Sequence, residues 1–426
     1  MTNKKILILT YYWPPAGGPG VQRWLKFVKY MPQNGIEPIV LTVDPAFAEY
    51  PQKDESLMQD IALDLKVYKT KCRSVYDLYK KFTHSKTAPY GGFANEAYPT
   101  LKQKISRFVR GNFFLPDPRR GWNKYAYREA IRLIREFQID TVVTTGPPHS
   151  THLVGLKLKR KIQHLKWISD FRDPWTDLYF YNLLYPTPIA KAVDRLYERN
   201  VLINADIVIT ISKHVKQQLA AKSPLIHAEK IRVIPNGYDE SDFLETIEKE
   251  KTFTITYAGT MATGYSVDVF FQVLKNIHNE IPYKIRFIGK IDERIRQNIP
   301  DDINEHFEFI PYQPHKQAVK FLQTSSVLLL VIPDIRDNQG ILTGKLFEYI
   351  GSDTPIICLG PINGNAAEII AECQAGQTFE PIDHSGIENY IRDCYYNFIN
   401  HHHNSHKTMA YRFSRKALTQ ELCKLI

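Results

Sequence analysis

The 426-residue sequence has few cysteines and no long apolar run. Its five cysteines are scattered, odd in number and without a C-x-x-C pair, which argues against a disulfide framework or a zinc site and fits a reducing compartment. No stretch approaches the roughly 18 apolar residues that cross a bilayer. Residues 1–5 precede a short strand-like run and lack the apolar core of a signal peptide. These absences predict a cytoplasmic protein and leave attachment to the inner face of the cytoplasmic membrane open.

Signatures of nucleic-acid and metal binding are also missing. The formal net charge of +10 favours anionic partners, such as nucleotide phosphates, anionic lipids or nucleic acid. The sequence has no RNA-binding signature, zinc-finger spacing or basic heptad region, so no nucleic-acid partner is predicted. A histidine group near the C-terminus lacks correctly spaced partner ligands and is typical of a solvated loop; it comprises His401, His402, His403 and His406. We expect neither a metal nor a cofactor.

The hydrophobic pattern predicts two α/β domains. The chain is long enough for two cores, and it opens with a strand over 5–10, an amphipathic helix over 21–33 and a strand over 37–42. This alternation of strand and helix continues after residue 125. It starts again at 254, after an acidic linker, which predicts two Rossmann-like parallel-sheet domains.

Residues 45–125 break the alternation and are predicted to form an elaborated insertion with helical patches near 76–82 and 100–110. Between Lys102 and Arg135 there are ten basic and two acidic residues. Aromatic residues, among them Phe108, Phe113, Phe114 and Trp122, are interleaved with them. This composition fits contact with an anionic membrane, and it equally fits a solvated helix face above core aromatics.

A short segment before the predicted strand 355–359 has the composition of a nucleotide site. Thr343 and Gly344 precede Lys345, and Glu348 follows one helical turn later. Gly344 permits close backbone approach, Lys345 offers a point charge to a diphosphate, and Glu348 can accept hydrogen bonds from ribose hydroxyls. The alternative is an exposed ion pair on a helix. That alternative does not explain the strand–loop–helix placement, so we predict a sugar-nucleotide site.

Glycine turns follow the first strand of each half. Gly17 and Gly18 follow strand 5–10, and Gly259 and Thr260 follow strand 254–257. Backbone N–H groups at such turns can approach a phosphate, to which a helix N-terminus adds positive potential. For Gly17 and Gly18 the alternative is a plain tight turn. Neither is a GxGxxG sequence, which disfavours dinucleotide binding.

Two further loops lie at strand ends, where open α/β sheets bind ligands. His149 follows strand 141–145 and can hydrogen-bond a sugar hydroxyl or shuttle a proton, or simply cap its loop. Asp170 and Arg172 follow the next strand. They are candidates for orienting an acceptor hydroxyl, with a structural salt bridge as the alternative.

Five motifs carry a resemblance that covers nearly the whole chain. They are PPAGG at 14–18, ADIVITIS at 205–212, IPNGYD at 234–239, YAGT at 257–260, and KLFEY at 345–349 followed by Pro355. With these motifs the chain resembles glycosyltransferase family 4, the retaining enzymes of the GT-B fold, and within it the bacterial surface-polysaccharide transferases. The resemblance implies two domains facing a central cleft. Residues 1–235 would bind the acceptor, 236–405 would bind the nucleotide sugar, and the helix 406–426 would return to the first domain.

The resemblance also implies residue roles. Glu348 matches the second glutamate of the family's Glu-x7-Glu motif, which holds the ribose, whereas the first glutamate falls at Gly340. Gly18 matches the loop glycine near the donor phosphate. The basic residues that many relatives carry after the Gly259 strand are absent, so we assign their charge to Lys345, with Lys290 as a second source. The family's histidine aligns near residue 145 or 146, and His149 is our substitute for it.

We therefore predict a retaining hexosyltransferase-type enzyme. It would move a sugar from a nucleotide-diphosphate sugar to a glycan or polyprenyl-linked acceptor in surface polysaccharide biosynthesis. Lys345 would stabilise the departing diphosphate and His149 would position the donor sugar. Two alternatives remain open: a nucleotide-sugar epimerase or hydrolase on the same fold, and a catalytically silent partner that binds glycan or membrane.

Overall fold

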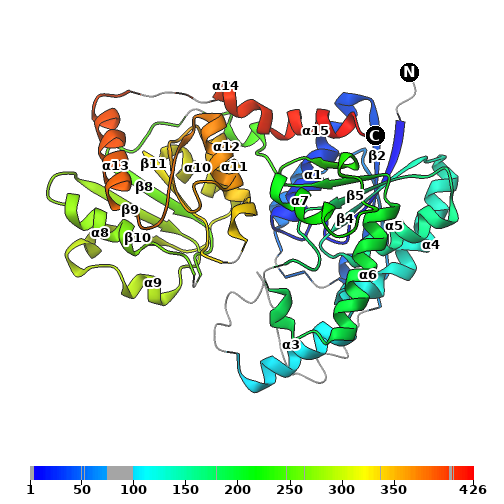
Figure 1. Ribbon diagram of the computed structural model, residues 1–426. Coiled ribbons are helices and arrows are strands. Elements are labelled where there is room, and N and C mark those ends of the chain that lie inside the picture. Colours follow the sequence, from blue (N-terminus) through cyan, green and yellow to red (C-terminus); the bar gives the residue numbers. More distant parts are fainter. Residues whose placement is uncertain are drawn as a thin grey trace. The chain divides into compact units, whose positions relative to one another are not determined.

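The computed structural model describes residues 4–48, 50–51, 53–73, 99–178, 180–245, 247–262, 264–335, 337–402, 405 and 407–426. The chain divides into two compact units. The first comprises Met1–Pro235 and Leu418–Ile426, and the second comprises Asn236–Ala417. Each unit is built on its own parallel sheet (Figure 1). The returning C-terminal segment is thus shorter than the predicted range 406–426.

The sheet of the first unit has seven parallel strands in the order β3-β2-β1-β4-β5-β6-β7. The order reverses between β1 and β4, and ligands of open α/β sheets bind at the carboxyl ends of the strands beside such a reversal. The strands are β1 (Lys4–Leu9), β2 (Ile36–Val43), β3 (Lys66–Thr70), β4 (Thr141–Gly146), β5 (Lys166–Phe171), β6 (Ile207–Thr210) and β7 (Ile231–Val233).

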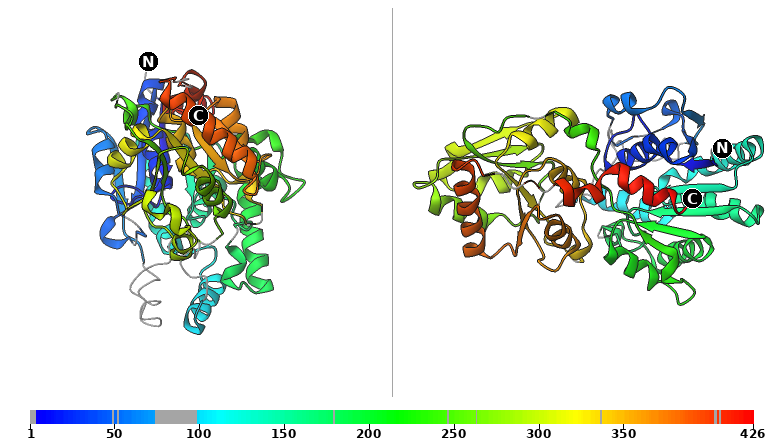
Figure 2. Two further views of the ribbon diagram at one scale, coloured as in Figure 1. Left: turned by 90° about the vertical axis from the view of Figure 1, so that its left-hand side faces the viewer. Right: turned by 90° about the horizontal axis from the view of Figure 1, so that it is seen from above.

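Helices cover both faces of this sheet (Figure 2). Successive side chains of a strand point to opposite faces, so Ile6 and Ile8 pack with one set of helices while Leu7 and Leu9 pack with another. The first set is α1 (Pro19–Tyr30) and α15 (Arg415–Cys423); the second set contains α4 (Asn123–Phe137) and α5 (Ser150–Lys161), with α6 (Pro188–Asn204) and α7 (Lys213–Ala220) farther along the same face. A further helix, α3 (Leu101–Phe113), confirms the predicted helical patch near 100–110. The predicted patch at 76–82 lies outside the described residues.

The second unit repeats the architecture with six parallel strands in the order β10-β9-β8-β11-β12-β13. Its reversal falls between β8 and β11. The strands are β8 (Phe253–Ala258), β9 (Tyr283–Ile288), β10 (Phe307–Ile310), β11 (Val327–Val331), β12 (Ile356–Leu359) and β13 (Gly376–Phe379). The prediction of two Rossmann-like parallel-sheet α/β domains is confirmed.

Helices again lie on both faces. The large core cluster joins one face of the sheet to α8 (Asp268–Ile277) and α13 (His384–Ile399), while α10 (His315–Thr324), α11 (Gly344–Gly351) and α12 (Asn365–Cys373) lie on the other (Figures 1 and 2). The short helices α9 (Glu293–Gln297) and α14 (Lys407–Ala410) complete the unit. β3 and β13 were not predicted from the sequence. Both are edge strands with partly polar faces, which weakens the pattern that identifies buried strands.

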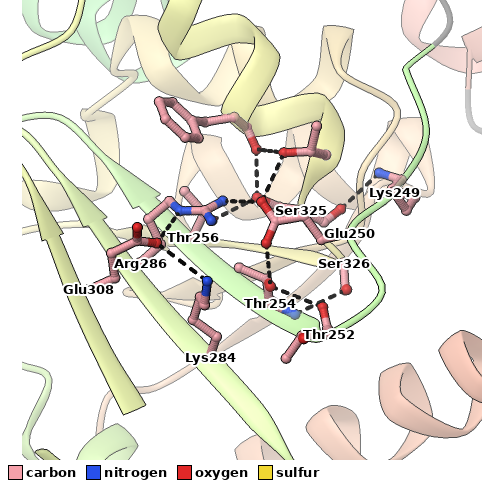
Figure 3. A network of polar contacts seen from close by, with 12 residues as sticks. Lys249, Glu250, Thr252, Thr254, Thr256, Lys284, Arg286, Glu308, Ser325 and Ser326 are labelled. Carbon is pink, nitrogen blue, oxygen red and sulfur yellow. Dashed lines mark hydrogen bonds and ion pairs between the residues drawn. The ribbon is translucent and has the colours of Figure 1, made fainter. Parts of the chain in front are cut away.

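A partly buried polar network joins β8, β9 and β10 to the segment that precedes β8 (Figure 3). The guanidinium of Arg286 lies 2.7 Å from Glu250, donates to Glu308 at 2.8 Å, and lies over the ring of Phe321. Lys249 donates to Thr354 Oγ1 at 2.7 Å, and burial lowers its pKa to about 8. These contacts hold β8 and β9 in register. The carboxyl ends of these two strands are followed by Gly259 and Gly289.

Replacing Arg286 with alanine is expected to lower the free energy of unfolding by about 2 kcal/mol. This is less than the roughly 3–5 kcal/mol of a fully buried pair, because Glu250 and Glu308 are partly exposed. Urea unfolding of the full chain measures the change. The matched control is Lys284→Ala, which removes an exposed contact to Glu308 and should cost about 0.5 kcal/mol or less. Equal costs for the two variants would contradict the prediction.

Candidate functional site

In the second unit, Lys345 lies at the carboxyl edge of the sheet, beside the reversal between β8 and β11. It occupies the first turn of α11, and its Nζ donates to Tyr257 Oη at 2.5 Å and lies 4.2 Å from the centroid of that ring. Tyr257 Oη donates in turn to the carbonyl oxygen of Thr260 at 2.7 Å. The structure therefore brings together Lys345, Gly259 and Thr260, three residues that the sequence analysis selected separately.

Gly259 is required by both its conformation and its neighbour. Its φ of +127° lies in the region that favours glycine, and a Cβ there would lie 2.6 Å from Lys345 Cε and 2.8 Å from Nζ. Gly289, with φ +111°, follows β9, and a Cβ there would lie 2.5 Å from the carbonyl oxygen of Gly259. Gly259 thus borders the lysine side chain, and Gly289 allows the backbone of Gly259 to pack closely against it.

Burial lowers the pKa of Lys345 to about 7, although the nearby Glu348 carboxylate opposes this shift. A lysine in this state holds its proton weakly near neutral pH. An anion bound beside it would stabilise the ammonium form and raise the pKa again. This electrostatic setting suits a diphosphate.

Glu348 lies one helical turn after Lys345 and has a side chain 29% exposed. Its Oε1 lies 3.7 Å from Nδ1 of His315, whose Nε2 lies 3.0 Å from Asp242 Oδ2. Burial raises the pKa of Glu348, with His315 opposing and Asp242 adding to the shift. The sequence analysis missed His315 and Asp242. The only available signal was that His315 begins the helix predicted over 315–323.

The remaining donor-side candidates of the second unit lie at the start of α11 and after β9. Thr343 is the N-cap residue of α11, yet its Oγ1 is buried and makes no hydrogen bond within the described part of the chain. Gly344 is the first residue of α11. Lys290 is exposed and follows Gly289, and its carbonyl accepts from the Met261 N–H at 2.9 Å. Tyr349, whose role the sequence did not reveal, accepts from the Ala258 N–H at 2.9 Å and so attaches α11 to the end of β8.

In the first unit, Gly17 and Gly18 lie between β1 and α1. Gly18 has φ +100° and is the N-cap residue of α1, where a Cβ would meet open space, so conformation alone favours glycine. Its carbonyl accepts from the N–H groups of Val21 and Gln22. The turn therefore begins the helix at the carboxyl edge of the sheet, as expected for a loop that presents N–H groups.

His149 precedes α5 at the end of β4 and is only 6% exposed. Its ring stacks on Trp175, with centroids 5.0 Å apart, and neither ring nitrogen has a hydrogen-bond partner among the described residues. Burial lowers the pKa of His149 to about 4, with Asp173 opposing the shift, so the imidazole is neutral near pH 7. A neutral imidazole offers one donor and one acceptor.

A second histidine, His152, was not selected from the sequence. It is fully buried, its Nδ1 lies 2.9 Å from Thr144 Oγ1, and its ring stacks on Phe171 at 4.5 Å. A Cβ on Gly146 would lie 2.6 Å from His152 Nε2 and 3.0 Å from His149 Nδ1. Both histidines therefore converge on Gly146, which only a glycine can occupy without displacing them. The only sequence signal was their spacing of three residues at the start of a helix.

Asp170 and Arg172 have different environments. Asp170 is fully buried and accepts from Arg23 at 3.0 Å, Trp24 Nε1 at 2.7 Å and Thr145 Oγ1 at 3.1 Å. Its contacts favour a role in positioning α1 over direct contact with an acceptor. Arg172 is partly exposed and pairs with Asp173 at 2.8 Å, and it remains the acceptor-side candidate.

Other expectations concern metals, membranes and the basic segment. Among the described residues, no group of three histidine, cysteine or acidic side chains is placed to hold a metal ion. Where the structure describes helices, none is long and apolar enough to cross a bilayer. His401 and His402 are exposed, whereas His403 and His406 lie outside the described residues. Trp122 is fully buried and donates to Thr70 Oγ1, so it belongs to the core and not to a binding face.

The two parallel-sheet α/β domains, together with the solved structures that they resemble, identify the GT-B class of fold. The whole chain is similar to a glycosyltransferase from Rickettsia africae ESF-5, with a TM-score of 0.62 and 14% identity over 100% of this chain and 98% of that one. Residues 20–242, just over half of the chain, match Glycosyltransferase Family 4, and the chain belongs to that family.

Two further relatives resemble the chain. O-antigen chain mannosyltransferase RfbU of Salmonella typhimurium (strain LT2) is 28% identical over 249 residues, which cover 55% of this chain and 61% of the relative. The chain therefore matches less than two thirds of that protein's length. HepE of Anabaena, solved in complex with UDP-glucose, has a TM-score of 0.59 and 12% identity, with 99% of each chain covered.

Proposed function

We propose that the protein is a retaining glycosyltransferase that moves a sugar from a nucleotide-diphosphate sugar to a glycan or polyprenyl-linked acceptor in surface polysaccharide biosynthesis. Family membership supports transfer of a glycosyl group. The similarity to an O-antigen mannosyltransferase supports a polysaccharide product, and a neighbour solved with UDP-glucose supports a sugar-nucleotide donor.

The contact of Lys345 with Gly259 carries this proposal. A partly neutral lysine thus lies against Gly259 at the strand-order reversal of the second unit, and α/β sheets bind ligands beside such reversals. As the bond between the sugar and the diphosphate breaks, negative charge grows on the departing phosphate. Lys345 and the N–H groups of α11 would stabilise that charge.

The remaining residues fit supporting roles. Glu348 would accept hydrogen bonds from the ribose hydroxyls, and the departing phosphate would take the proton of the acceptor hydroxyl, so no strong protein base is needed. His149, neutral at physiological pH, would hydrogen-bond the donor sugar. Lysine and helix dipoles would supply the compensating charge, so the proposed reaction needs no metal.

Product analysis tests the reaction class. The full chain is incubated with UDP-glucose, GDP-mannose or ADP-glucose, each with and without a lipid-linked or oligosaccharide acceptor. A transferase consumes donor only when the acceptor is present and forms a glycosylated product. Consumption without acceptor would indicate an epimerase or hydrolase. Binding without any consumption would indicate a catalytically silent partner. This alternative stands because Gly340 replaces the first glutamate of the family motif.

Glu348→Ala is expected to weaken binding of the nucleoside diphosphate by about tenfold, or about 1.4 kcal/mol, because the ribose loses its acceptor. Isothermal titration calorimetry on the full chain measures the affinity. The control is Glu280→Ala, an exposed carboxylate that precedes β9 and so lies at the other edge of the same sheet. Unchanged affinity of the Glu348 variant would remove this residue from the ribose site.

A further inference from the structure

Exposed apolar side chains concentrate on α3 and the segment that packs against it. Of the twenty large hydrophobic residues exposed in the described chain, seven come from 101–113 and 183–189, with exposed fractions from 41% to 78%. These seven form what we call the α3 patch: Leu101, Ile105, Phe108, Phe113, Leu183, Tyr185 and Ile189. Such a concentration of apolar surface marks an interaction site.

The α3 patch is held in a defined position. α3 lies beside the turn Tyr181–Leu184 and the start of α6, away from the sheet (Figures 1 and 2). Gly111 allows the helix to contact the backbone of Leu184, because a Cβ there would overlap it. Asn112 donates to the carbonyl of Tyr185 at 3.0 Å and accepts from the Thr187 N–H at 2.7 Å. The helix is therefore attached through its last turn, at Gly111 and Asn112, while Leu101, Ile105 and Phe108 in the preceding turns stay exposed.

The exposed apolar stripe follows the period of a helix and borders a hollow. Leu101, Ile105 and Phe108 are spaced by four and three residues, which places them on one face. Ile105 and Phe108 line an apolar hollow of about 320 Å³ together with Tyr185 and Lys104.

The charge of α3 indicates what covers the patch. The helix carries four basic residues and no acidic one, and of these Lys102 and Lys104 are exposed next to the apolar stripe. Apolar side chains flanked by exposed lysines are typical of helices that lie in the interface of an anionic bilayer. The remainder of the basic segment does not contribute in this way, because α4 buries Ala126, Ala130 and Leu133 in the core.

We propose that the α3 patch docks the protein on an anionic lipid bilayer, with α3 lying in the interface plane and its lysines among the headgroups. A second copy of the chain is the main competing occupant. A two-fold contact through α3 would bring two helices of the same charge together, which is unfavourable. Docking is independent of the donor chemistry, so it can fail or succeed separately from the proposed transferase activity.

Co-sedimentation of the full chain with vesicles tests the proposal. Vesicles containing phosphatidylglycerol are compared with vesicles of phosphatidylcholine alone, without nucleotide. The parent chain should sediment with the anionic vesicles, and added salt should weaken this binding. Ile105→Ser with Phe108→Ser should reduce it about tenfold or more, and Lys102→Gln with Lys104→Gln should reduce it severalfold.

Matched controls carry Leu225→Ser or Ile382→Ser, which remove exposed apolar side chains outside the patch. These variants should bind vesicles like the parent, and all variants should keep the parent's thermal unfolding and nucleoside diphosphate affinity. Equal sedimentation of the parent with both vesicle types, or no loss in the Ile105 and Phe108 variant, would overturn the proposal. The proposal would also be overturned if the parent did not bind vesicles and light scattering showed a dimer of the parent that this variant abolishes.

Discussion

Replacing Lys345 with alanine is expected to weaken binding of a nucleoside-diphosphate sugar at least about tenfold and to reduce turnover by about 100-fold. The side chain is held between the ring of Tyr257 and the backbone of Gly259 and supplies positive charge to the diphosphate. The loss in turnover exceeds the loss in affinity because the charge on the leaving phosphate grows in the transition state. Calorimetry and initial rates with UDP-glucose, GDP-mannose and ADP-glucose measure the two effects.

The pH dependence of binding follows from the same lysine. Its pKa in the free protein is lowered to about 7 by burial. The diphosphate of a sugar nucleotide does not titrate near this pH. Affinity should therefore be highest below pH 7 and fall as pH rises through 7, by up to about tenfold per unit. The stability of the unliganded protein depends on pH in the opposite direction. Between pH 7 and 10.5 the unfolded chain binds more protons than the folded one, so the contribution of Lys345 to stability increases with pH across that range.

Two control variants test whether the loss of affinity and its pH dependence are specific to Lys345. Lys275→Ala removes an exposed lysine on α8, which packs on the other face of the same sheet, and should leave binding and its pH dependence unchanged. Lys345→Arg should rescue little, because the larger guanidinium does not fit between Tyr257 and Gly259. If Lys345→Ala keeps the parent's affinity at pH 6, the lysine has no role in holding the diphosphate.

Asp170→Ala is expected to lower the free energy of unfolding by about 3–5 kcal/mol, the largest stability effect that we predict. Asp170 and Arg23 are both buried and form a two-point contact, with Arg23 Nε and Nη2 donating to the carboxylate at 3.2 and 3.0 Å. Without the carboxylate, the buried guanidinium loses its two-point ion pair, and Trp24 Nε1 loses its acceptor. Urea unfolding of the full chain gives the difference.

The control for this prediction is Asp173→Ala in the same loop. Asp173 is partly exposed and pairs with Arg172, so its removal should cost about 1 kcal/mol or less. The double variant Arg23→Met, Asp170→Leu should regain much of the lost stability, because it removes both charges and keeps the volume. If the parent and Asp170→Ala unfold at the same urea concentration, Asp170 does not hold α1 against β5.

The fold was predictable from the sequence because its central strands are buried on both faces and therefore appear as continuous apolar runs. The position of Lys345 was predictable for a related reason, since it lies at a boundary between strand and helix that a glycine marks. Its main partner was not. Tyr257 is 88 residues away, and the two meet only because β8 and β11 are neighbours in the sheet.

At the histidines, too, the contacts between residues could not be predicted from the sequence. His149 stands out in the sequence because it follows a glycine–proline loop, whereas His152 looks like an ordinary helix residue. Its convergence with His149 depends on the backbone of Gly146, which a linear pattern does not describe. Asp170 was visible at a strand end, but its burial depends on Arg23, 147 positions earlier. In each case the missing information was a contact between distant segments.

The two ends of the chain meet in the first unit, which has a consequence for biosynthesis. Lys4 Nζ donates to the carbonyl of Ile426 at 2.6 Å, and Leu418 and Leu422 complete the core around Ile6. The second unit is one unbroken segment. On the ribosome, domains fold as their residues become available. The first unit should therefore complete its core only after Leu418–Ile426 has been synthesised, later than the second unit, and deletion of this segment would uncover apolar side chains around Ile6.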